Sequence, residues 1–275
     1  MTRPMETRKS KTKWTVKELK TFLAGEATRL RLDCGLHAPP YNLYSVADLL
    51  DVQVEERFIP DFDGYIEVRD KKYVAVISTK KHPTRQRFTL GHELGHVVLM
   101  KFMENEGAPA RRRYRAKKKM PSLHQDPIEE SLCNYFAGEL LMPANEVKER
   151  LKGKTIEPET IFNLGKEFHV SSQAAAVNVI KLRKEIIACT LWSLNSLWPL
   201  PVWWVGRKTK LLSELKALEY LVGKRKNCTE LWESYGEKDY RFEIRISPTP
   251  ESRFAMILVR YLDDFEVRRW GRRQL

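Results

Sequence analysis

Residues 85–99 read RQRFTLGHELGHVVL and contain the densest chemical pattern in the chain. Within them, His92, Glu93 and His96 form the pattern HExxH, and a helix places positions i and i+4 on one face. The two imidazoles then point to one location, where they can share a zinc ion, and Glu93 can reach a water molecule beside it. The spacing therefore predicts part of a catalytic zinc site, with Glu93 as the catalytic base.

The residues around this pattern predict a buried helix. Apolar side chains flank the pattern on both sides, and Gly91 and Gly95 lie inside it. Each glycine costs about 1 kcal/mol relative to alanine in a helix. That cost is reasonable where a second backbone approaches closely. The alternative, a solvated helix that carries two histidines and a glutamate by chance, does not explain the apolar flanks.

The third zinc ligand must come from another segment. A catalytic zinc ion takes three protein ligands and keeps a fourth position for water. The extended pattern HExxHxxGxxH is excluded, because Leu99 and Phe102 occupy the positions of its glycine and its third histidine.

The sequence DPIEE at the start of the next predicted helix supplies a candidate. Asp126 is a suitable N-cap, Pro127 fits the first turn, and Glu129 completes a capping box. Glu130 is then left for another role, since a carboxylate on a buried helix face requires a cation or a proton. Asn134, one turn further on, is placed to orient a ligating histidine. The alternative is that Glu130 is solvated.

The two segments that contain these residues resemble a known family. RQRFTLGHELGHVVL (85–99) followed by EESLCNYFAGELLMP (129–143) is similar to the ImmA/IrrE family of zinc metallopeptidases. The upstream segments DGYIEV and YVAVIST also fit the family, whereas Cys133 stands where alanine is usual. The resemblance covers about residues 15–185.

The resemblance implies a zincin-type α+β fold and a hydrolase. It implies that His92, His96 and Glu130 hold one zinc ion per chain and that Glu93 is the catalytic acid and base. Members of the family cleave helix-turn-helix repressors, which relieves repression in stress responses or mobile-element induction. The implied activity is therefore regulatory proteolysis, with such a repressor as the protein substrate.

A peptidase also needs a donor that stabilises the tetrahedral oxyanion. The candidates for this donor, or for a substrate contact, are His124, Tyr114, Arg87 and Tyr65, and each has an ordinary structural role as its alternative. His124 is the strongest, because it stands shortly before the second helix. Residues 73–77 form either an edge strand that pairs with an extended substrate or an ordinary core strand.

Four regions are predicted along the chain. Residues 1–14 form a basic tail, residues 15–153 the zincin-like peptidase domain, residues 154–187 a helical extension that resembles a helix-turn-helix, and residues 188–275 a small α+β domain of unknown role. The second helix of the extension is mostly apolar, which favours packing against the peptidase core over DNA recognition.

Composition narrows the remaining classes of protein. The 275 residues suffice for a sizeable core, and no run of about 18 apolar residues predicts a membrane span. The basic N-terminal residues are not followed by the apolar region of a secretory signal. The four cysteines lie far apart, which favours a reducing compartment. We therefore expect a cytoplasmic protein.

The formal net charge of +13 leaves two alternatives to the peptidase open. Basic runs, including residues 111–119, attract nucleic acid or an acidic protein partner, or are solvated loops. A basic DNA-binding regulator or a toxin–antitoxin-type interaction protein would carry a non-catalytic zinc site. Structural zinc normally has four protein ligands. Three ligands and a well-placed glutamate therefore favour the enzyme, and direct DNA binding is not favoured.

Overall fold

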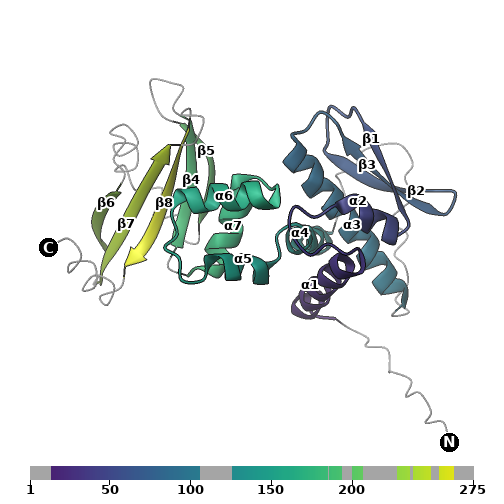
Figure 1. Ribbon diagram of the computed structural model, residues 1–275, viewed down its shortest axis with the longest axis horizontal. Coiled ribbons are helices and arrows are strands. Elements are labelled where there is room, and N and C mark those ends of the chain that lie inside the picture. Colours follow the sequence, from purple (N-terminus) through teal and green to yellow (C-terminus); the bar gives the residue numbers. More distant parts are fainter. Residues whose placement is uncertain are drawn as a thin grey trace, which may run out of the picture. The chain divides into compact units, whose positions relative to one another are not determined.

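A computed structural model describes residues 14–105, 126–184, 186–193, 200–206, 228–235, 238–248 and 254–262. The architecture is α+β, as predicted (Figure 1). Of the described residues, those up to residue 143 together with 168–170 form one compact unit, and the others form a second. The predicted division into domains stays a prediction. The elements of the first unit are α1 (Val16–Asp33), α2 (Leu43–Leu49), β1 (Val52–Arg57), β2 (Gly64–Arg69), β3 (Lys72–Ser78), α3 (Pro83–Asn105) and α4 (Pro127–Leu141).

The first sheet has β3 at its centre, in the order β1-β3-β2. β1 runs parallel to β3, and β2 runs antiparallel to it. The β2–β3 hairpin turns at Asp70 and Lys71, which have positive φ values of 47° and 67°, as a two-residue turn requires. The suggestion that residues 73–77 form an edge strand is wrong, because β3 is paired on both sides. The edges of this sheet are β1 and β2.

The two faces of this sheet have different surroundings, since successive strand residues point to opposite faces. Ile77 lies on the face next to α3, where a Cβ on its partner Gly64 would be only 2.7 Å from Thr89 Cγ2. Val74 and Val76 lie on the other face and form a small apolar cluster with Ile59. The helix that carries HELGH is therefore packed against one defined face of the sheet.

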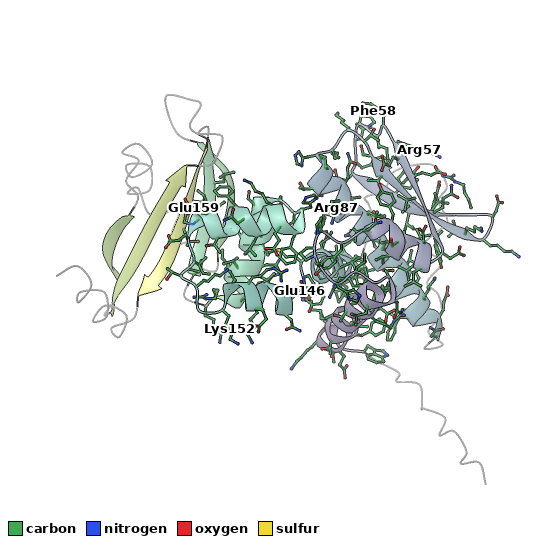
Figure 2. All side chains as sticks on the ribbon, in the orientation of Figure 1. Arg57, Phe58, Arg87, Glu146, Lys152 and Glu159 are labelled. Carbon is green, nitrogen blue, oxygen red and sulfur yellow. The ribbon has the colours of Figure 1, made fainter. Side chains whose placement is uncertain are left out.

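The end of β1 presents an exposed aromatic side chain. Phe58 follows β1 directly and is 72% exposed, beside Arg57 (Figure 2). Arg57 forms an ion pair with Glu55, which also pairs with Arg69 of β2 at 2.6 Å. These ion pairs lie at the surface, where each contributes little to stability.

Helix α4 is held by contacts with both α1 and α3. Arg31 of α1 is buried, and its Nη1 donates to the Glu139 carbonyl at 2.6 Å. The last carbonyls of a helix lack helical partners, so Arg31 supplies a donor that the end of α4 needs. The Arg31 guanidinium also lies over the Tyr41 ring at 5.3 Å. These contacts fix the position of α4 relative to the rest of the first unit.

In the described residues, the second unit contains three helices and a five-stranded antiparallel sheet. Its sheet has the order β5-β4-β8-β7-β6, with every neighbouring pair antiparallel. The elements are α5 (Ala144–Leu151), α6 (Pro158–Phe168), α7 (Ser172–Leu182), β4 (Ile186–Ser193), β5 (Leu200–Gly206), β6 (Cys228–Tyr235), β7 (Lys238–Pro248) and β8 (Phe254–Leu262).

Helix α7 buries its apolar face against neighbouring elements. Ala175, Ala176, Val179 and Ile180 are buried, and the helix packs against β4, β5 and α5. Helix α5 lies within the predicted peptidase domain, residues 15–153, whereas the packing of α7 against the second sheet was not predicted.

Among the described residues, no helix combines the length and the apolar character that a membrane span would need.

Candidate metal centre

Gly91 and Gly95 mark the place where α3 crosses α4. A Cβ on Gly95 would lie 3.1 Å from Cys133 Cα, and one on Gly91 would lie 3.3 Å from Ala137 Cβ. These distances are at the lower limit for real side chains, so the two helices are close to backbone contact. The close approach predicted from the two glycines is confirmed. Because α3 and α4 are so close, polar side chains of one helix can contact polar side chains of the other.

Replacing Gly95 with alanine is expected to destabilise the fold, because the added methyl group meets the Cys133 backbone. Overpacking costs about 1–3 kcal/mol, which exceeds the gain of about 1 kcal/mol in helix propensity. Gly25 in α1 is the matched control, since nothing lies within 4 Å of its Cβ position. Gly25→Ala is expected to stabilise by up to about 1 kcal/mol. Urea unfolding measures both variants, and equal effects would contradict the close crossing.

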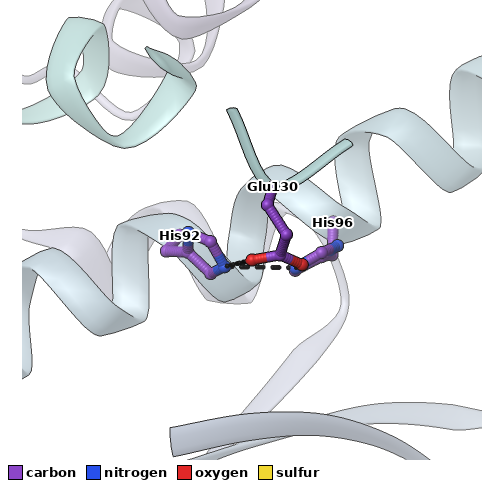
Figure 3. A group of neighbouring side chains, drawn as sticks. All are labelled: His92, His96 and Glu130. Atoms are coloured by element: carbon purple, nitrogen blue, oxygen red, sulfur yellow. Dashed lines mark hydrogen bonds and ion pairs between the residues drawn. The ribbon is translucent and has the colours of Figure 1, made fainter. Parts of the chain in front are cut away.

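The two histidines and Glu130 converge on one point (Figure 3). His92 Nε2 and His96 Nε2 are 3.2 Å apart. The Glu130 carboxylate lies across them, with Oε2 at 3.3 Å from His92 Nε2 and Oε1 at 3.4 Å from His96 Nε2. All the ligand atoms of the group lie within 4.8 Å of one another. Helix α3 thus supplies two donors and helix α4 supplies the third.

The other ring nitrogen of each histidine faces an oxygen atom of α4. His92 Nδ1 is 3.0 Å from Asn134 Oδ1, and His96 Nδ1 is 3.1 Å from Glu129 Oε1. An oxygen acceptor favours a proton on Nδ1, which leaves the Nε2 lone pair free for a metal. Both rings are therefore oriented by the helix that also supplies Glu130.

The group fits a tetrahedral metal ion in its donor set and in its spacing. Ligand atoms at about 2.0–2.1 Å from a tetrahedral zinc ion are about 3.3–3.4 Å from one another. The two Nε2 atoms, 3.2 Å apart, match this value, and each faces one oxygen of the Glu130 carboxylate at 3.3 or 3.4 Å. With one oxygen taken from Glu130, the three ligand atoms lie within 4.8 Å of one another. Two imidazoles and one carboxylate are also a donor set that catalytic zinc uses.

The electrostatics of the group also suit a cation. Burial lowers the pKa of His92, which favours its neutral, ligating form. The hydrogen bond to His96 lowers the pKa of Glu130. Burial opposes a charge on His96, but contacts with Cys133, Glu129 and Glu130 outweigh it and raise the pKa of this histidine. The groups around His96 therefore favour positive charge at this ring, whereas burial disfavours it at His92.

Glu93 lies beside these groups and is almost fully buried, with 6% of its surface exposed. Burial raises the pKa of its carboxyl to about 7, against an opposing effect of His96. A carboxyl group with such a pKa exchanges protons near neutral pH. Its position one residue after His92 is suited to acid–base chemistry at the metal.

The other sequence candidates are not brought to this group. Arg87 donates from Nη2 to the Tyr41 carbonyl at 3.0 Å, and its buried Nε has no partner in the part of the chain that is described. Tyr65 packs with Phe62, at 5.8 Å between ring centroids, on the sheet face away from α3. The remaining candidates, Tyr114 and His124, lie outside the described residues, as does the basic run 111–119.

Glu129 is the residue that the sequence reasoning missed. It was assigned only to a capping box, whereas Asp126 caps α4 through the amide of Ile128 and Glu129 reaches His96. One signal was present in the sequence. A zinc site with two histidines needs two Nδ1 acceptors, and Asn134 accounts for only one of them.

Comparisons with known proteins concern the domain that carries this group. A peptidase family model, described as the IrrE N-terminal-like domain, matches residues 47–179, which include both helices of the site. Among solved structures, a Mycobacterium tuberculosis transcriptional regulator is similar with a TM-score of 0.52. The two share 14% sequence identity over 90% of this chain and 82% of that chain, so this likeness concerns the fold alone. No curated protein matches the sequence of this chain.

Proposed function

The chain carries a peptidase-type domain consistent with the ImmA/IrrE family over residues 47–179, and on this basis we propose that it is a zinc-dependent, site-specific endopeptidase. His92, His96 and Glu130 hold the zinc ion, and Glu93 is the catalytic acid and base. The observation that carries the proposal is the convergence of the three donor groups, with a buried carboxyl of raised pKa beside them.

Zinc bound to this group supplies Lewis acidity, which lowers the pKa of a water molecule and polarises the scissile carbonyl. Glu93 accepts a proton from the attacking water as the new C–O bond forms. It then donates this proton to the amide nitrogen as the C–N bond breaks, which gives a carboxylic acid and an amine. Asn134 holds the His92 ring in place during this sequence. The second proton of the water passes from the new carboxylic acid to the amine, so the products are a carboxylate and an ammonium group, and Glu93 ends in its starting state.

The substrate that we propose is a helix-turn-helix transcriptional repressor, whose cleavage relieves repression in the cytoplasm. This substrate class rests on the resemblance of residues 85–99 and 129–143 to the ImmA/IrrE family. The net charge of +13 supports an acidic region of such a partner as a recognition element.

The proposal is tested by incubating the purified full chain with helix-turn-helix repressors encoded beside its gene. Cleavage at one site is expected, with loss on addition of a chelator and recovery on addition of zinc. Mass spectrometry of the products identifies the bond. A chain that binds zinc but cleaves none of these repressors would refute the substrate class, and a chain that binds no zinc would refute the enzyme.

A second candidate is a DNA-binding regulator with a non-catalytic metal site. It is supported by the fold likeness to a protein described as a transcriptional regulator, and by the succession of α6 and α7. The burial of four residues of α7 weighs against it, because a recognition helix must expose its reading face. Sequence-specific DNA binding that is unaffected by a chelator would favour this candidate.

A further inference from the structure

The contact between Glu129 and His96 gives the two histidines a second carboxylate partner, in addition to Glu130. Glu129 Oε1 lies 3.1 Å from His96 Nδ1, and the side chain is only 30% exposed. Its neighbour Glu130 contacts Nε2 of the same ring. One imidazole is therefore held on both sides by adjacent residues of α4.

The two histidines differ in the charge of the group that faces their Nδ1 atom. The Nδ1 partner of His92 is the neutral amide oxygen of Asn134, whereas that of His96 is a carboxylate oxygen. Both oxygens can orient a ring. Only the carboxylate also adds negative charge, which makes the imidazole a stronger donor to a metal.

We propose that Glu129 is a positioning residue for His96, which holds the Nδ1 proton and turns Nε2 toward the metal with an added negative charge. This inference rests on the proposed zinc site. With Glu129 and Glu130 both ionised, two negative charges balance a divalent cation within a partly buried group. Desolvation of the cation is then offset locally, since buried charges require partners.

A helix-start role is the competing explanation, because Glu129 lies in the first turn of α4, where a negative charge is favourable. Glutamine can also occupy the third position of a capping box. Glu129→Gln therefore removes the charge but preserves the capping capacity. Glu18 is the matched control, since it occupies the same position in α1, in a capping box with Thr15.

The experiment measures zinc affinity of the full chain by competition with a fluorescent chelator. Removing a carboxylate that hydrogen-bonds to a ligating histidine typically lowers metal affinity by about 10- to 100-fold. Glu129→Gln is expected to weaken zinc binding by about 10-fold, and Glu129→Ala by up to about 100-fold. Glu18→Gln is expected to bind zinc like the wild type. Thermal unfolding of the metal-free proteins should give the same midpoint for the wild type and Glu129→Gln.

Two outcomes would overturn the inference alone. In the first, Glu129→Gln binds zinc with the affinity of the wild type. In the second, Glu129→Gln loses zinc affinity, but its metal-free form also loses an equal amount of free energy of unfolding. A wild-type chain with no zinc affinity would overturn the proposed function itself, and this inference with it. The two failures are therefore distinguishable from the wild-type measurement.

Discussion

The Glu93→Gln variant is expected to retain its zinc ion and to lose about 10²- to 10⁴-fold in kcat/KM for repressor cleavage, the range that general acid–base catalysis contributes. The amide has nearly the same shape as the carboxyl but cannot accept the proton of water or return it to the leaving amine. The fold should tolerate the change, because the native carboxyl, with a pKa of about 7, is already partly neutral near neutral pH.

Zinc content and cleavage rate are measured on the same preparation of Glu93→Gln. Glu104 provides the matched control, since it lies on the same helix, about three turns further on, and is exposed. Glu104→Gln should cleave at the wild-type rate. If Glu93→Gln cleaved as fast as Glu104→Gln, Glu93 would have no catalytic role, even with the metal site intact.

The second large effect is expected from Glu130→Ala, which should weaken zinc binding by more than about 100-fold. This loss exceeds the 10- to 100-fold typical of residues that only support a ligand, because a direct donor is removed. The two imidazoles would remain, with their Nε2 atoms 3.2 Å apart, but no anion would face them from α4. Cleavage should be lost in parallel with zinc at limiting metal concentration.

Glu139→Ala is the control for this variant, because it removes a carboxylate from the same helix at a position that contacts Tyr135. Equilibrium dialysis against zinc compares the two proteins, and circular dichroism checks their helix content. Zinc binding that survives in Glu130→Ala would show that the third ligand lies elsewhere in the chain, and α4 would then serve only to support the histidines.

Local patterns were sufficient to predict the parts of this site that depend on one helix at a time. The i, i+4 spacing places His92 and His96 together on any helix, whatever surrounds it. Gly91 and Gly95 predicted close backbone contact, because their cost in helix propensity requires a compensating reason. The position of Glu130 was likewise predicted by the cap at Asp126, which sets the register of α4.

Contacts between elements required the tertiary structure. The position of β3 in the centre of its sheet could not be read from residues 73–77, since a buried strand has the same apolar run whether one or both of its sides are paired. Similarly, the apolar face of α7 showed that the helix is covered, but not that the second sheet covers it. Periodicity describes a face and carries no information about its partner.

Glu129 illustrates the same limit at the site itself. From the sequence it was a suitable capping residue, and its contact with His96 depends on where α4 crosses α3. The placement of Tyr65 and Arg87 away from the metal group was likewise decided by the sheet and by the Tyr41 carbonyl. The sequence by itself thus determined which residues can ligate a metal, because that property is local. Only the packing of α3 against α4 decided which neighbours orient those ligands, because orientation depends on distances between segments far apart in the chain.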